Sequence, residues 1–298
     1  MALVPEAVLW KLTLCYDGSA FAGWQVQPGQ RTVQGALAAA LRRVTGEAVL
    51  PQGSGRTDAG VHALAQVASV LLRSPVPPAN LQRALNNVLP VAIRILRAEH
   101  APSGFHARHS ALRKTYEYRI WRAPLCLPWL APYVCAYTFP LKLEPMWEAA
   151  KAVLGTHDFT SFQAPEPDGA ARAKSGVKRA LERERDLPSV PSGLRNGPVL
   201  EPVALRTIHP TIRTLFQSEW ETPEPDLLVY RVCGSGFLHH MVRNLIGTFL
   251  AVGRGQIASS ALPAILAARV RAAAGPTAPA CGLWLHSIEY PVDPPVLR

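Results

Sequence analysis

The stretch GSGRTDAGVHAL, residues 53–64, places one carboxylate, Asp58, two residues after Arg56 and among three glycines. A guanidinium near a carboxylate keeps it ionised and orients it through charge-assisted hydrogen bonds. The glycines permit unusual backbone angles and let a bulky planar ligand approach the main chain. Such a carboxylate suits attack on an electrophilic carbon or removal of a proton. The same pattern also fits an aspartate that only caps a helix or closes an Asx-turn.

Several other chemistries are disfavoured by the motifs. Paired-acid glycoside hydrolysis needs a second carboxylate beside the first. The glycine-rich stretch lacks both GK[ST] and GxGxxG, so it predicts neither a P-loop nor a dinucleotide site. The histidines are scattered, with no HExxH motif and no zinc-type Cys/His spacing. His239 and His240, placed on one helix, would point about 100° apart, which is poor chelation geometry. The sequence therefore predicts no metal site.

A second charge of interest, Arg243, lies in the apolar stretch FLHHMVRNLIGTFLAVG, residues 237–253. The periodicity of this stretch predicts a largely buried helix, and a buried arginine needs an anionic partner. Asp58 is the natural partner if the two parts of the chain face each other. The alternative is that Arg243 reaches the surface from one edge of the helix.

Tyr116 lies on a predicted strand, in the sequence FHARHSALRKTYEYR. It is most simply a sheet-face aromatic, but strand aromatics also serve as stacking platforms for unpaired bases. Arg108, Arg113 and Lys114 surround it, which gives the mixture of basic and aromatic residues expected for RNA contact.

The elements that must position these residues form two similar successions. In the first part, periodicity and turn residues predict strands at 8–18, 64–72 and 92–100 that alternate with helices at 32–46 and 80–89. In the second part they predict strands at 114–122, 227–234 and 283–291 and helices at 144–155 and 237–253. We therefore expect two α/β halves, residues 1–110 and 111–298. Residues 165–210, rich in proline, glycine and alternating charge, read as an inserted surface loop whose cations are either solvated or in contact with a polyanion.

The composition indicates which kinds of binding partner and cellular location to expect. The 298 residues carry a formal net charge of +10, which favours a polyanionic partner such as nucleic acid, although basic chains also simply resist aggregation. The five cysteines form no regular framework, which suggests a reducing compartment. The sequence has no apolar run of about 20 residues and no signal-peptide pattern. We expect a cytoplasmic protein with no membrane partner, an organellar location being open if the source is eukaryotic.

Six blocks of the sequence resemble the TruA-type tRNA pseudouridine synthases, in the family's order and over nearly the whole chain. They are YDGSAFAGWQ, GSGRTDAGVHALAQV, FHARHSALRKTYEYRI, GTHDFTSF, GFLHHMVRNLIGTFLAVG and GLWLHSIEYP. The resemblance implies an α+β fold in which two RRM-like (ferredoxin-like) halves form an extended antiparallel sheet, flanked by helices, over a central RNA-binding cleft. It also implies a homodimer that binds the anticodon arm of tRNA and isomerises uridines at positions 38, 39 or 40.

The resemblance assigns roles to residues of this chain. Asp58 matches the essential aspartate, Arg56 the arginine of the same motif, Tyr116 the tyrosine that packs on the target uracil, and Arg243 the arginine that pairs with the aspartate. The glycosidic bond breaks, the uracil rotates and C5 rejoins C1′, so the reaction requires no cofactor and no metal. Asp58 starts it either by attacking C1′ or by taking the C2′ proton, and Arg56 can hold a flipped-out nucleotide. His62 is expected to be structural.

Two alternatives belong to other classes of protein. One is a non-catalytic RNA-binding protein that keeps the fold, against which the intact set of site residues argues. The other is an unrelated aspartate-nucleophile hydrolase, which is disfavoured because no metal-ligand acids accompany Asp58. The segment from residue 165 to residue 210 is longer than the resemblance leads us to expect, which leaves its contribution to RNA contact open.

Overall fold

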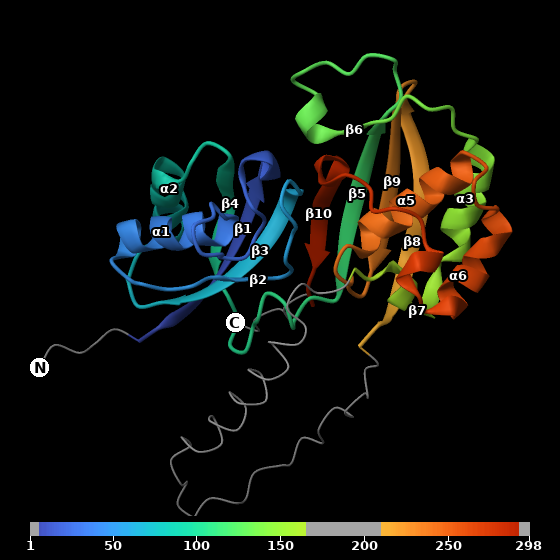
Figure 1. Cartoon of the computed structure of the whole chain (residues 1–298). Helices are drawn as coiled ribbons and strands as arrows, with labels where there is room; N and C mark the ends of the chain where they lie inside the picture. The colour runs from blue at the N-terminus through green and yellow to red at the C-terminus, as the bar shows by residue number, and fades with distance from the viewer. Residues whose placement is uncertain (1–5, 165–209, 292–298) are drawn as a thin grey trace, which may run out of the picture.

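Residues 6–164 and 210–291 are described by the structure, a computed structural model of the chain, in which ten strands form a mixed, mostly antiparallel sheet (Figure 1). The loop expected at 165–210 lies, except for its last residue, outside the described residues. The strands are β1 (Val8–Tyr16), β2 (Gln52–Gly53), β3 (His62–Leu72), β4 (Ile93–His100), β5 (Arg113–Trp121), β6 (Cys135–Ala136), β7 (Gly155–Asp158), β8 (Ile212–Glu224), β9 (Leu227–Gly234) and β10 (Leu283–Glu289). Their order is β4-β1-β3-β10-β5-β9-β8-β7, with β2 paired to β3 and β6 to β5.

The N-terminal part of the sheet follows the predicted succession of elements. Alternate residues of β1, among them Leu12 and Leu14, are buried, as expected for a strand with one face on the core. Helices α1 (Val33–Thr45) and α2 (Pro78–Val88) pack over this part of the sheet. The side chain of Thr32 accepts from the Gly35 N–H at the beginning of α1, which supplies the N-cap that this helix needs.

The C-terminal part carries α3 (Leu143–Ala152), α5 (Met241–Gly253) and α6 (Leu262–Ala268), with α3 packed against α5. Two boundaries differ from prediction. The helix expected at 237–253 begins only at Met241, because His240 takes a left-handed φ of 58° that cannot continue a helix. The helix expected to end at Gly155 ends at Ala152, and Gly155 instead begins β7, a strand that periodicity did not predict.

The two parts meet at β10, which lies between β3 and β5. β10 runs antiparallel to β5 but parallel to β3, pairing Trp284 with His62 and Leu285 with Ala63. The sheet was expected to be antiparallel and is mostly so, with parallel pairs at this seam and between β5 and β6. His62 is fully buried there, stacks on Trp284 and accepts from the Gly18 N–H through Nδ1. Burial lowers the pKa of His62, which agrees with a neutral ring in a structural position.

Candidate active site

The loop that carries Asp58 is fixed to the core of the N-terminal part. The Trp24 N–H donates to the Thr57 carbonyl at 3.0 Å, and the Thr57 hydroxyl is 2.8 Å from the Tyr16 hydroxyl. Gly23 lies against the same carbonyl with φ at +91°, and a Cβ there would approach the Thr57 oxygen to 2.6 Å. Only glycine combines this backbone angle with so close an approach. The position of Asp58 is therefore determined by contacts on both sides of the loop.

Asp58 is paired with Arg243 across the seam. Arg243 Nη1 donates to Asp58 Oδ2 at 2.9 Å, and its Nε donates to the Ala278 carbonyl at 2.8 Å. Arg243 lies in the first turn of α5 with 15% of its side chain exposed, and Asp58 has 24% exposed. The sequence named Asp58 as the natural partner of Arg243, and the ion pair is present. A guanidinium held at both ends in this way fixes the direction of the carboxylate.

His239 and His240 are also brought to Asp58, which the sequence did not predict. His240 Nε2 is 3.2 Å from Asp58 Oδ2, and His239 Nε2 is 3.8 Å from Oδ1. The expectation that the two imidazoles diverge on a helix is wrong, because both precede α5 and their ring centroids are 4.0 Å apart. Burial, then the charges of His239, Arg243 and Arg271, lowers the pKa of His240 against the opposing effect of Asp58.

Tyr116 lies on β5 facing the same space, with 8% of its surface exposed. Its ring meets Phe237 edge to face, with the centroids 5.0 Å apart. Burial, and to a smaller extent the charges of Tyr16 and Asp58, raises the pKa of the Tyr116 hydroxyl above its ordinary value. The hydroxyl is thus protonated at neutral pH, and the ring is available as an apolar surface.

Three of the basic residues singled out from the sequence line the cleft. Lys114 lies partly buried, and its Nζ donates to the Ser54 carbonyl. Burial, then the charges of Arg108 and Arg213, lowers the pKa of Lys114 to about 8. Arg108 and Arg56 lie on the cleft wall, where Arg56 is exposed. Asp58 is in ion pairs with His239, His240 and Arg243, three residues of the C-terminal part.

Of the four residues predicted to bind the substrate, Arg113 alone does not line the cleft in the described structure. Its guanidinium lies 4.4 Å from the Phe216 ring, and Nε is 4.0 Å from Glu289. Alternate residues of a strand point to opposite faces of the sheet, so Arg113 cannot share the face of Lys114 and Tyr116.

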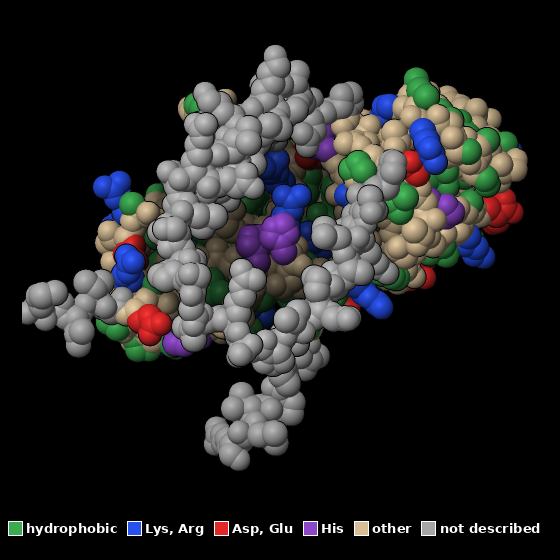
Figure 2. Space-filling view, turned by 90° about the horizontal axis from the view of Figure 1, so that it is seen from below, with side chains coloured by type: hydrophobic (Ala, Val, Ile, Leu, Met, Phe, Trp, Pro, Cys, Tyr) green, Lys and Arg blue, Asp and Glu red, His purple; other side chains and the backbone are tan. Residues whose placement is uncertain are grey.

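The cleft around Asp58 has a volume of about 650 Å³, in the range of pockets that bind a small ligand or a single nucleotide. Basic and histidine side chains gather near the middle of the face seen from below in Figure 2, the side on which residues 101–112 and the beginning of β5 lie. A pocket with one carboxylate, several cations and buried aromatic rings suits a planar base attached to a phosphate backbone.

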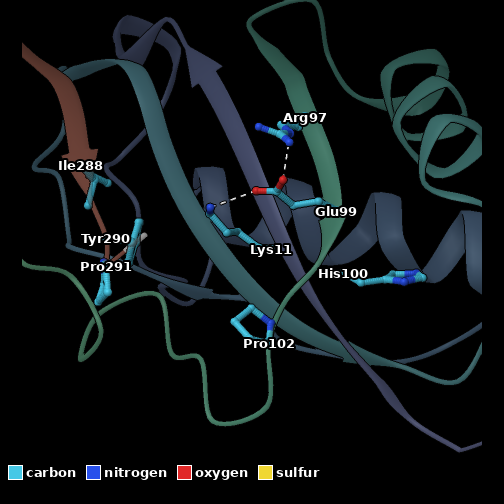
Figure 3. Close-up of a pocket in the computed structure, with 8 residues that line it drawn as sticks. All are labelled: Lys11, Arg97, Glu99, His100, Pro102, Ile288, Tyr290 and Pro291. Atoms are coloured by element: carbon cyan, nitrogen blue, oxygen red, sulfur yellow. Dashed lines mark ion pairs between the residues drawn. The ribbon is translucent and has the colours of Figure 1, made fainter. Parts of the chain in front are cut away.

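A second hollow, of about 370 Å³, lies between β1, β4 and the end of β10 (Figure 3). Glu99 is in ion pairs with Lys11 at 2.9 Å and Arg97 at 2.8 Å. The single carboxylate of this lining is thus neutralised by two cations. This hollow offers no free acid, and we do not regard it as the reaction site.

His239, His240, Phe237 and Leu238 line the cleft but were missed as site residues by the sequence reasoning. The only local signal is their position directly before the block that holds Arg243. Helical periodicity assigned them to the helix and so concealed the turn that brings them to Asp58.

Comparisons with known proteins agree with one another. The family model described as tRNA pseudouridine synthase matches residues 14–110 and 204–291. A tRNA pseudouridine synthase A from Solibacter usitatus is 43% identical over 281 residues, covering 94% of this chain and 98% of that protein. The enzyme of the same name from Moorella thermoacetica is 42% identical over 282 residues, with the same two coverages. That from Lacticaseibacillus casei is 38% identical over 283 residues, covering 94% of this chain and 99% of that protein.

Proposed function

Because this chain belongs to the TruA-type tRNA pseudouridine synthases, we propose that its cleft isomerises uridines of the anticodon arm, at positions 38, 39 or 40, with Asp58 as the catalytic group. Membership makes the protein an isomerase that forms pseudouridine in tRNA. The observation that carries the assignment of Asp58 is its carboxylate in the cleft, paired with Arg243 at 2.9 Å.

The reaction begins at the ribose. The C1′–N1 bond breaks, the uracil turns, and C5 forms a new bond to C1′ while the C5 proton leaves and N1 gains a proton. Asp58 starts this either by attacking C1′ or by taking the C2′ proton. Atoms and electrons balance within the nucleotide, so the proposal includes no cofactor and no metal. A primary kinetic isotope effect with deuterium at C2′ would distinguish the two routes, because only removal of the C2′ proton breaks the C2′–H bond.

The remaining cleft residues divide into contacts with the base and contacts with the backbone. Tyr116, with Phe237 against its edge, packs on the uracil and holds it after the glycosidic bond breaks. Arg56 holds the nucleotide out of its stack, which costs a few kcal/mol of lost stacking. Lys114 and Arg108 receive phosphates of the flanking nucleotides. Arg113 is kept only as a candidate contact outside the cleft.

The assembly and location are further parts of the proposal. We propose that residues 1–110 and 111–298 act as the two halves around the cleft, and that the protein is a homodimer with one tRNA in contact with both subunits. It acts where tRNA is processed, in the cytoplasm. Across the described residues no helix has the length and apolar character needed to span a membrane.

The decisive test is to incubate the purified protein with unmodified tRNA transcripts and to map pseudouridine at single-nucleotide resolution. We expect pseudouridine at positions 38–40 with the wild type and at least about a hundredfold slower formation with Asp58→Asn. Asp226→Asn, at an exposed position between β8 and β9, is the matched control and should behave as the wild type. Turnover by Asp58→Asn at the wild-type rate would refute the role of Asp58. Binding of tRNA without pseudouridine formation by the wild type would leave the RNA-binding alternative.

A further inference from the structure

The turn that precedes α5 gathers three metal-binding side chains. Asp58, His239 and His240 each offer one ligand atom, and these atoms all lie within 4.8 Å of one another. The carboxylate comes from the N-terminal part of the sheet and both imidazoles from the C-terminal part, so folding alone brings the set together. We propose that these residues bind one divalent transition metal ion, of the Zn²⁺ class, and that the bound metal blocks the cleft.

The distance between His240 and Asp58 is close to that between neighbouring ligands of a tetrahedral site. Zinc binds imidazole nitrogen and carboxylate oxygen at about 2.0–2.2 Å, which places neighbouring ligand atoms about 3.3 Å apart. His240 Nε2 lies 3.2 Å from Asp58 Oδ2, and His239 Nε2 lies 3.8 Å from Oδ1. The two distances involve different carboxylate oxygens, so the site requires the His239 ring, whose side chain is 31% exposed, to turn toward the ion. All three residues line the cleft, so water or an anion there can supply a fourth ligand.

The ligand types select the metal. Two imidazoles and one carboxylate suit zinc and its neighbours in the transition series, whereas magnesium and calcium prefer oxygen ligands throughout. A carboxylate has about four lone-pair directions, so Asp58 can keep its hydrogen bond from Arg243 while it binds a metal. The charges of Arg243 and Arg271, which act on His240, oppose the metal charge, and the site is therefore expected to exchange its ion rather than to hold it permanently.

The left-handed turn explains why the two imidazoles converge. His240 is one of two non-glycine residues with positive φ in the described chain, a conformation that costs roughly 1–2 kcal/mol. It ends the extended segment and turns the chain into α5, so that the rings come to lie 4.0 Å apart at a tilt of 35°. On a continuous helix the same two residues would diverge.

The binding claim does not depend on the proposed function, but the blocking claim rests on Asp58 acting on the nucleotide. A metal ion bound to the carboxylate draws off its electron density, which makes Asp58 a poorer nucleophile and a weaker base toward the ribose. The ion also takes up part of the cleft that Asp58 and Tyr116 both line. Metal and nucleotide should therefore exclude each other, and a chelator should restore activity.

The test of binding uses Co²⁺ as the probe, because its visible absorption becomes much stronger in a tetrahedral protein site than in water. We expect one saturable equivalent for the full-length wild type. The variant His239→Gln/His240→Gln should bind at least about tenfold more weakly, and so should Asp58→Asn. The matched control is His106→Gln/His109→Gln, which removes the other close imidazole pair, with ring centroids 4.3 Å apart, and should retain the wild-type band. Thermal melting verifies that each variant is folded.

The outcomes are separable. An unchanged band in His239→Gln/His240→Gln would overturn the site, and so would an intense near-ultraviolet band from cysteine thiolate, since five free cysteines are present. In the pseudouridine assay, Zn²⁺ at fixed Mg²⁺ should inhibit the wild type, and EDTA should reverse the inhibition. Binding without inhibition would overturn the blocking role. A protein that forms no pseudouridine at all would refute the proposed function and leave the cobalt result standing.

Discussion

Arg243 Nη1 lies 2.9 Å from Asp58 Oδ2 although the two residues are 185 positions apart in the sequence. The same guanidinium is tied to the Ala278 carbonyl, so its position does not depend on Asp58 alone. The carboxylate on one part of the sheet is thus oriented by a cation on the other. Several testable consequences concern this pair and the residues around it.

Replacing Arg243 separates orientation from binding. Arg243→Gln removes the charge opposite Asp58, and we expect kcat to fall by about tenfold to a hundredfold, the equivalent of about 1–3 kcal/mol for a hydrogen bond to a charged group. The Kd for tRNA should change less, because the partner of Arg243 is the carboxylate and not a phosphate. Arg243→Lys keeps the charge and should recover part of kcat. An effect on Kd with no effect on kcat would contradict this role.

Tyr116 tests whether the ring or the hydroxyl matters. Burial raises the pKa of this hydroxyl, so the phenolate form is disfavoured and Tyr116 is a poor base. Tyr116→Phe keeps the stacking surface and should retain activity within about tenfold. Tyr116→Leu removes base stacking worth about 1–3 kcal/mol and should be clearly slower. Single-turnover rates of both variants provide the measurement, and a Phe variant as slow as the Leu variant would point to the hydroxyl instead.

The lowered pKa of Lys114 leads us to expect that tRNA binding depends on pH. Its pKa is lowered to about 8, mainly by burial, so the ammonium loses its proton as the pH rises through that value. Phosphate favours the charged form, and affinity for tRNA should therefore weaken between about pH 7 and about pH 9. Lys114→Arg remains charged over this range and should remove that part of the dependence. Fluorescence anisotropy with labelled tRNA at constant ionic strength measures it.

The same shift in the pKa of Lys114 leads us to expect that the free energy of unfolding depends on pH. The pKa of Lys114 falls from 10.5 to about 8 on folding, so the unfolded chain binds more protons between these values. The free energy of unfolding should consequently rise with pH across this window, and the cost of burying the charge is fully present below about pH 8. Urea unfolding of Lys114→Met should show a smaller rise than the wild type.

Gly23 should be more sensitive than an exposed glycine of similar conformation. A Cβ at Gly23 would meet the Thr57 oxygen at 2.6 Å, whereas nothing lies within 4 Å of a Cβ at Gly29, whose φ is +68°. Gly29→Ala should cost about 1–2 kcal/mol through its backbone angle. Gly23→Ala should cost more and should also slow pseudouridine formation, because it displaces the loop of Asp58. Equal thermal melting and equal activity of the two variants would contradict this account.

Periodicity and turn residues were sufficient for most of the fold. Three predicted elements agree with the structure to within two residues at each end. They are the strands at 8–18 and 227–234 and the helix at 32–46, which correspond to β1, β9 and α1. These segments have clear alternation or helical spacing because each has one face on the core. Four strands, β2, β6, β7 and β8, and the helix α6 were not predicted. β7 has four residues, GTHD, with little apolar pattern, and in β8, the longest strand, a register shift between Leu215 and Gln217 breaks the alternation.

The site was only partly readable from the sequence. Asp58 and Arg243 could be paired from the argument that a buried arginine needs an anion. The positions of His239 and His240 could not be predicted. They depend on the positive φ of His240, which arises where the chain enters α5 and does not alter the hydrophobic periodicity of the sequence. The position of Arg113 depends on which face of β5 borders the cleft. Tertiary packing determines that face, and local sequence does not predict it.

β10 has a consequence for when the cleft first exists. This strand, Leu283–Glu289, is the last described element of the chain and lies between the sheet segments that carry Asp58 and Tyr116. During synthesis the ribosome releases it after all the other described strands, and until then β3 and β5 lack their shared neighbour. The nascent chain can therefore form its two packed parts first and join them only when β10 emerges, so a chain that still lacks β10 does not present an assembled cleft to tRNA.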